Sequence, residues 1–264
     1  MRKVLLLSTS QVLSRNSLDF ANYLGKGKGF HLKGLFFSGS NDTASFDAFN
    51  SDEDVATQAI TVPAAITEFQ SVATMKGIQH SIQILKNDIL QEIQEETRFA
   101  DVLVCDASLS PVNLGLGLSP FVRKVLADAK CPVVVAPVKF DELEEIVFTY
   151  DGSDTSMYAI KQFTYLFPDF SETPVSVLQI LPAGAEKNPG QNKLIDLLKF
   201  HYNSLSFTAR EGEEAEIELF RQFVGKKNSL LVMGAYGRKM ITNERSTADI
   251  LLRNIDTPMF IAHF

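Results

Sequence analysis

Two copies of one structural unit run through this chain, and the clearest sign of them is an apolar segment that recurs in each half. In the second half, Leu230-Leu-Val-Met233 leads into Gly234-Ala-Tyr-Gly237. In the first half, Val102-Leu-Val-Cys105 leads into Asp106-Ala-Ser108. Uninterrupted apolar runs are typical of buried parallel strands, and glycines at the carboxyl end of such a strand let a ligand's phosphates approach the backbone. The second half therefore predicts a nucleotide site, and the first half a copy that has lost it.

Apolar and amphipathic segments alternate in the same order in both halves. Strands are expected at residues 3–9, 30–37, 80–85 and 132–136, and again at 145–151, 175–181, 206–209 and 258–262. The fourth strand of each copy is the apolar run within the segments 100–108 and 230–238. Helices are expected between them at 14–21, 55–76, 88–99 and 121–129, and at 153–160, 193–203, 213–224 and 248–254. Strands that alternate with helices pair in parallel through right-handed crossovers. The predicted fold class is α/β, with two tandem doubly wound sheets of five parallel strands.

The length of 264 residues is enough for two domains, each with its own core. A short charged linker at residues 138–144 separates the copies and predicts domains at 1–140 and 141–264. Ser14 and Ser153 stand where they would cap the first helix of each copy. We expect the two domains to pack through their final strands, Cys131–Pro137 and Pro258–His263, because both are apolar.

Composition excludes several kinds of partner. The net charge of −7, without any tract rich in Lys and Arg, argues against nucleic acid. No apolar run reaches the roughly 18 residues of a membrane span, and the first apolar strand is too short for a signal peptide, so we expect a cytoplasmic protein without a membrane partner. Cys105 and Cys131 lie in apolar runs and are expected to be buried free thiols. Isolated histidines leave no spacing typical of a metal centre.

The arrangement resembles the universal stress protein family in its tandem, two-domain form, and the resemblance covers essentially the whole chain. The residues that carry it are Thr149-Tyr150-Asp151-Gly152-Ser153, Arg210-Glu211-Gly212 after the third strand, Met233-Gly234-Ala235-Tyr236-Gly237-Arg238, and Ser246-Thr247-Ala248 at the start of the last helix. The resemblance implies the strand order 3-2-1-4-5, binding of ATP or AMP, and dimers formed through the last strand.

Nucleotide-binding members of that family carry the motif Gly-x2-Gly-x9-Gly-[Ser/Thr], and this chain keeps only its first two glycines, Gly234 and Gly237. Strict spacing places Thr247 at the third glycine. Alignment on the last helix instead places Ser246 at the hydroxyl position and Arg245 at the glycine, in a loop two residues shorter, and we prefer this register. The Arg245 side chain either blocks the pocket or pairs with phosphate oxygens in place of backbone donors.

The resemblance assigns further roles in the second copy. Asp151 would accept a hydrogen bond from the ribose or the adenine, although an Asp-Gly turn before a helix cap explains it as well. Ile180 would line the base pocket, and Ser246 would donate to phosphate or simply cap its helix. Arg238 either reaches a phosphate or is exposed to solvent. The candidate nucleotide-binding residues are Thr149, Tyr150, Asp151, Ile180, Met233, Gly234, Tyr236, Gly237, Arg238, Arg245, Ser246 and Thr247.

Together these features predict a stress-response regulator that binds adenine nucleotide in the second copy only. The first copy has Thr9 in place of Asp151, and Asp106 would repel phosphate. A second hypothesis is an interaction scaffold with a closed pocket. Enzymatic activity would be slow ATP hydrolysis at most, since the P-loop pattern is absent. We leave three points open: whether Mg²⁺ binds, whether a regulatory protein is a partner, and whether a homodimer forms beyond the intrachain pseudo-dimer. Gly234 is expected at an exposed strand end, where substitution by Asp would barely change folding.

Overall fold

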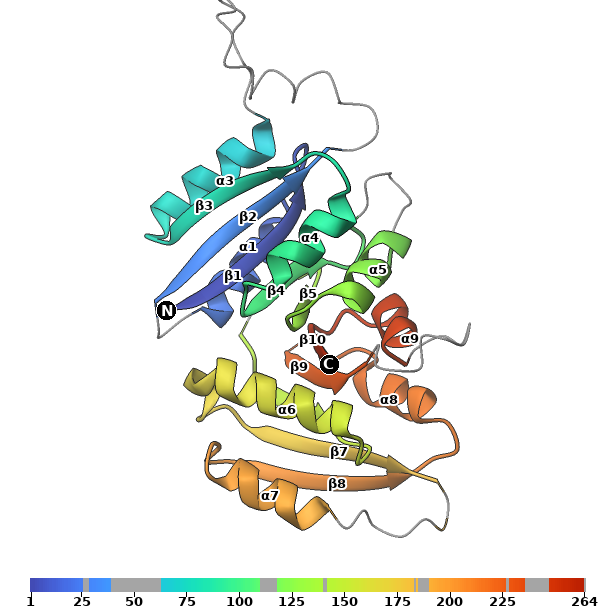
Figure 1. The fold of residues 1–264 in the computed structure, drawn as a ribbon. Helices are drawn as coiled ribbons and strands as arrows, with labels where there is room; N and C mark the ends of the chain where they lie inside the picture. The colour runs from blue at the N-terminus through green and yellow to red at the C-terminus, as the bar shows by residue number, and fades with distance from the viewer. Residues whose placement is uncertain are drawn as a thin grey trace, which may run out of the picture.

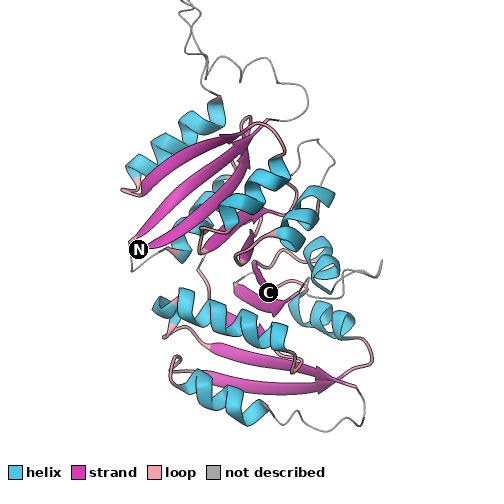
Figure 2. Cartoon of the chain, viewed as in Figure 1, coloured by secondary structure: helices cyan, strands magenta, loops and turns pink. Residues whose placement is uncertain are grey.

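A computed structural model describes residues 1–25, 29–38, 63–109, 118–139, 142–182, 184, 190–226, 228–235 and 247–263. The strands form one ten-stranded sheet in the order β3-β2-β1-β4-β5-β10-β9-β6-β7-β8. Helices cover both faces of this sheet, and β3 and β8 form its two edges (Figures 1 and 2). The predicted strand order 3-2-1-4-5 is therefore confirmed in both halves.

Each half contributes five strands and the helices that connect them. The first half contains β1 (Arg2–Thr9), α1 (Arg15–Leu24), β2 (Phe30–Phe37), α3 (Ala64–Met75), β3 (Gln79–Leu85), α4 (Ile89–Thr97), β4 (Val102–Asp106), α5 (Pro120–Asp128) and β5 (Val133–Ala136). The second contains β6 (Glu145–Thr149), α6 (Asp154–Leu166), the short η2 (Pro168–Phe170), β7 (Val175–Leu181), α7 (Gln191–Lys199), β8 (Leu205–Glu211), α8 (Ala215–Phe223), β9 (Ser229–Gly234), α9 (Thr247–Asn254) and β10 (Met259–Ala262).

The two halves join through their final strands. β5 and β10 pair antiparallel, with Val134 opposite Phe260 and Val133 opposite Ile261. All other strand pairs in the sheet are parallel. The predicted contact between the final strands is confirmed, and it takes the form of main-chain pairing that merges two five-stranded sheets into one.

Side chains that alternate along each strand fill two cores. On β1, Val4 and Leu6 enter the cluster beneath α1, α3, α6 and α7, whereas Leu5 and Leu7 enter the cluster beneath α4, α5, α8 and α9. A strand buried on both faces needs apolar residues at every position, which explains the uninterrupted apolar runs in the sequence.

The helix starts follow the predicted caps. The side chains of Ser14 and Ser153 accept hydrogen bonds from the backbone N–H groups of Ser17 and Ser156, and so begin α1 and α6. Some predicted bounds were wrong. Arg210 and Glu211 belong to β8, because they continue its pairing with β7, so only Gly212 follows that strand. The part of the predicted 55–76 helix before residue 63 and the proposed boundary at residues 140–141 lie outside the described residues.

Both cysteines are free thiols, as predicted, but only Cys105 is fully buried, and Cys131 is half-buried. Burial raises the pKa of Cys105 above its ordinary value and that of Cys131 to about 12, so both thiols are protonated at neutral pH and unreactive. In the described ranges, no helix is both long and apolar enough to span a membrane. The same ranges contain no cluster of three or more His, Cys, Asp or Glu residues with the spacing of a metal site.

Candidate functional site

One cavity in the second half is lined by every candidate residue that the structure describes. These residues are Thr149, Tyr150, Asp151, Ile180, Met233, Gly234 and Thr247. The cavity has a volume of about 120 Å³. The remaining candidates, Tyr236, Gly237, Arg238, Arg245 and Ser246, lie outside the described residues. The structure therefore brings together residues from four separate segments of the sequence.

The cavity lies where the order of the strands in the second half reverses, next to β6. β6 pairs with β7 on one side and with β9 on the other, and the residues at the carboxyl ends of all three strands line the cavity. In open α/β sheets, ligands bind at the carboxyl ends of the strands, at such switch points. The position of the cavity is therefore that of a ligand site in this fold class.

Asp151 forms the turn that joins β6 to α6. Its carboxylate accepts a hydrogen bond of 2.9 Å from the Ser153 backbone N–H, and Gly152 adopts a φ of 83° in the left-handed region. Removal from water tends to raise the pKa of Asp151, but hydrogen bonds from Ser153 and Ser156 outweigh this effect and lower it. The turn interpretation of this residue thus applies, and the side chain still borders the cavity as a carboxylate.

Gly234 is held against the first turn of α6. A β-carbon at this position would lie 2.5 Å from the carbonyl carbon and oxygen of Thr155 and 2.7 Å from the Ser156 backbone nitrogen. Such a contact with backbone atoms requires α6 or β9 to move. The expectation that Gly234 can be replaced without an effect on folding was therefore wrong, because the glycine sits at a close crossing of a strand and a helix.

The cavity has an apolar wall that the sequence indicated only in part. Leu178 on β7, and Ala215 and Leu219 on α8, line it together with the predicted Ile180 and Met233. Leu178, Leu219 and Met233 are all buried in the core beneath α8 and α9. We did not predict Leu178, Ala215 and Leu219, although the two-residue spacing of Leu178 and Ile180 on one strand placed them on the same face.

The polar residues of the cavity are largely engaged with the protein. The Thr149 hydroxyl donates a hydrogen bond of 3.2 Å to the carbonyl oxygen of Val232 and so links β6 to β9. Ser156, which we also did not predict, donates from its hydroxyl to the Ser153 carbonyl at 2.9 Å. The Tyr150 side chain belongs to the core on the opposite face of the sheet. Asp151 is the carboxylate that the cavity presents among its described lining residues.

Strand pairing identifies the equivalent positions in the first half. Val104 lies beside Leu6 and Val134, as Val232 lies beside Phe148 and Phe260. Counting along the paired strands from these residues matches Ile180 with Phe37 and Gly234 with Asp106. Counting back from β10 and β5 into the preceding helices, without a gap, matches Thr247 with Phe121.

Two aromatic rings occupy this part of the first half. The Phe37 side chain is fully buried, and its ring centroid lies 5.0 Å from that of Phe121, at an angle of 47°. Asp106 accepts hydrogen bonds from the backbone N–H and the hydroxyl of Ser108, at 2.7 and 2.6 Å. The positions that border a cavity in the second half therefore carry bulky or negatively charged side chains in the first.

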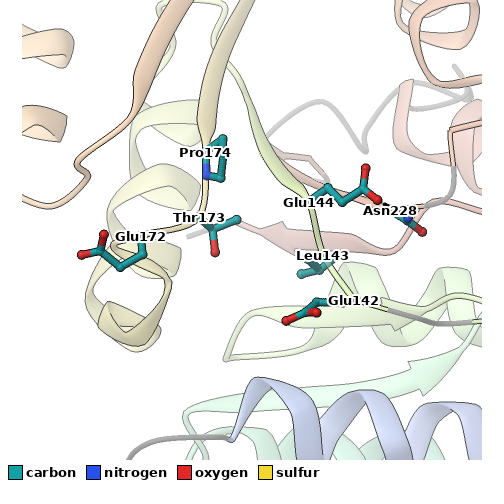
Figure 3. Close-up of a pocket in the computed structure, with 7 residues that line it drawn as sticks. All are labelled: Glu142, Leu143, Glu144, Glu172, Thr173, Pro174 and Asn228. Atoms are coloured by element: carbon teal, nitrogen blue, oxygen red, sulfur yellow. Dashed lines mark hydrogen bonds between the residues drawn. The ribbon is translucent and has the colours of Figure 1, made fainter.

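A larger depression of about 580 Å³ lies at the opposite, amino-terminal ends of β6 and β7 (Figure 3). It is lined by Glu142, Leu143, Glu144, Glu172, Thr173, Pro174 and Asn228. Glu144 accepts a hydrogen bond of 2.7 Å from the Asn228 side chain, as Figure 3 shows. Three carboxylates and no cationic side chain among its described lining residues make this depression unsuitable for a phosphate group.

Comparisons with known proteins support the fold. A universal stress protein from Archaeoglobus fulgidus superposes with a TM-score of 0.62 at 14% identity, over 98% of this chain and 97% of that one. A Pseudomonas aeruginosa protein provisionally assigned to the universal stress proteins gives 0.62 at 15% identity, over 99% and 92%. A second P. aeruginosa protein, of unknown function, gives 0.62 at 16% identity over the same shares. No protein-family model and no curated protein matches the sequence. The chain therefore has the fold of universal stress protein structures along nearly its whole length.

Proposed function

We propose that this protein is a cytoplasmic member of the universal stress protein family that binds ATP or AMP in its second half and acts as a regulator. One observation carries the proposal. Seven residues that the sequence nominated as nucleotide-binding line a single cavity at the switch point of the sheet, and the equivalent region of the first half is filled by Phe37 and Phe121. In this proposal, the first half is a structural partner of the half that binds.

The chemistry of the cavity fits the base and ribose of a nucleotide. Leu178, Ile180 and Leu219 offer an apolar surface for adenine, and the Asp151 carboxylate accepts a hydrogen bond from a ribose hydroxyl. The volume of about 120 Å³ is below the roughly 300–1,000 Å³ of typical ligand pockets. The phosphates would therefore extend beyond this cavity, past Gly234 and toward the start of α9.

Regulation is favoured over catalysis in this proposal. The described residues that line the cavity include one carboxylate, Asp151, and neither Lys nor Arg. Phosphoryl transfer depends on cationic groups or metal ions that stabilise the developing negative charge. Any ATP hydrolysis would therefore be slow. The small cavity volume favours a second candidate function, an interaction scaffold that binds no nucleotide.

Two measurements on the purified protein test the proposal. Mass spectrometry of small molecules released by denaturation should detect an adenine nucleotide. Calorimetric titration with ATP, ADP and AMP should show saturable binding at one site per chain, with guanosine triphosphate as the control for base recognition. Absence of binding at millimolar nucleotide would replace the proposal with the scaffold function. Two sites per chain would contradict the restriction to the second half.

A further inference from the structure

An ion pair with one buried member connects the two halves near the cavity. The Nε atom of Arg123 on α5 lies 2.8 Å from the Oδ2 atom of Asp249 on α9. The side chain of Asp249 is only 1% exposed, whereas that of Arg123 is 38% exposed. Removing a carboxylate from water is costly unless a partner compensates its charge. Arg123, a residue of the half without the cavity, therefore compensates a buried charge in the other half.

The two members of this pair occupy equivalent positions in the repeat. Counting back from the matched strands β5 and β10 without a gap aligns Arg123 with Asp249. In a symmetric pairing of identical units, each of these residues would meet its own copy, and like charges would face each other. The halves of this chain instead carry opposite charges at the shared position, so their contact is favourable.

The pair acts on the element that begins at the cavity. Thr247 is the first residue of α9 and lines the cavity, and Asp249 follows it within the same helical turn. α9 has eight residues, and a helix of this length is not stable on its own in water. Its position therefore depends on tertiary contacts, and these include the burial of Ala248 in the core and the Arg123–Asp249 pair.

We propose that Arg123 is a positioning residue for the cavity of the second half, and that it fixes the first turn of α9 through Asp249. Loss of the guanidinium leaves a buried carboxylate without this partner, and water then reaches Asp249 as the first turn of α9 moves outward. Thr247 moves with it, and the wall of the cavity shifts. The part of this inference that concerns ligand affinity rests on the proposed function.

Hydrogen exchange of the α9 amides tests the positioning role without any nucleotide. In the full-length Arg123→Gln variant, the α9 amides that donate to the carbonyls of the first turn should exchange at least about tenfold faster than in the wild type. Arg123→Lys should restore most of the protection, because it keeps the charge. The double variant Arg123→Gln/Asp249→Asn should also recover protection, because it removes the buried charge that Arg123 offsets. Unchanged exchange of α9 in Arg123→Gln would overturn the inference.

Calorimetry with ATP then tests the consequence for the site. We expect Arg123→Gln to weaken binding about tenfold, equivalent to about 1.4 kcal/mol, and the double variant to recover most of it. Arg15→Gln is the matched control, because Arg15 forms an exposed ion pair with Glu68 within the first half. A wild type that binds no ATP would refute the proposed function, and the exchange data would still decide the role of Arg123. Equal ATP affinity of wild type and Arg123→Gln would limit Arg123 to a structural contact and so overturn its role at the site.

Discussion

The carboxyl ends of the strands in the two halves show how one fold can either keep or fill a cavity. In the second half, Ile180, Gly234 and Thr247 border open space. Their counterparts in the first half are Phe37, Asp106 and Phe121, and the two rings are in contact. The backbone topology is the same in both halves. At three matched positions, the described side chains that border a cavity in the second half are replaced in the first half by two packed rings and a carboxylate.

The largest expected effect comes from removing side chains at the matched pair Phe37 and Ile180. Phe37 is fully buried, so Phe37→Ala should cost about 3–5 kcal/mol in the free energy of unfolding. Ile180 is only partly buried and already borders a cavity, so Ile180→Ala should cost about 1 kcal/mol. Urea unfolding of both variants measures the difference. Equal costs would mean that the two positions are packed alike and that the comparison fails.

The second effect concerns the close crossing at Gly234. Gly234→Ala should destabilise the protein by about 1–3 kcal/mol, because the added methyl group meets the backbone of Thr155. The reciprocal change Asp106→Gly is the control, and it should cost about 1 kcal/mol, since it removes the hydrogen bonds to Ser108. Urea unfolding decides this as well. A neutral Gly234→Ala variant would show that the strand and the helix separate easily.

The third prediction places the bulky side chain found in the first half at the matched position of the second half. Ile180→Phe should fill part of the cavity of about 120 Å³ and weaken nucleotide binding at least tenfold, or about 1.4 kcal/mol. Ile217→Phe on α8 is the matched control, because Ile217 is 41% exposed and does not line the cavity. Calorimetry with ATP measures both variants. Unchanged affinity in Ile180→Phe would place the nucleotide elsewhere.

The smallest expected effect is that of pH on nucleotide affinity. The pKa of Asp151 lies below its ordinary value, so the carboxylate stays ionised in the folded protein down to below about pH 3.9. Its hydrogen bonds to Ser153, and its capacity to accept one from ribose, are present above that range and are lost only as pH falls through the lowered pKa. Nucleotide affinity should therefore be constant between about pH 5 and 8. A decline within that window would indicate that another group controls binding.

Much of the fold could be predicted because its signals are local. The strands at 30–37 and 175–181 have the predicted bounds, since uninterrupted apolar runs reflect burial on both faces of a parallel sheet. Ser14 and Ser153 mark their helix starts through contacts with residues three positions away. The predicted bounds of α7 and β8 were less accurate, because their exposed ends give weak hydrophobic patterns.

The candidate site was predictable only where it follows strand ends. Thr149, Asp151, Ile180 and Met233 could be identified because carboxyl ends of neighbouring parallel strands meet at one edge of a sheet. Leu219 was missed, because its place in the wall depends on how α8 packs across the sheet. The tight contact of Gly234 with Thr155 was missed for the same reason. Distances between a helix and a strand are not encoded in either segment alone.

The sequence by itself determined the order of the elements, their parallel pairing and the equivalence of the two halves, because each depends on short-range periodicity repeated along the chain. The tertiary structure decided which distant side chains meet. It joined Phe37 to Phe121 in the first half, and it brought Arg123 to Asp249 between the halves. These contacts join segments far apart in the sequence, and close packing of helices on the sheet fixes them to within a few ångströms. No local pattern carries that information, so the packing of Phe37 against Phe121 became visible only in the folded chain, although the sequence had already indicated that the two halves differ.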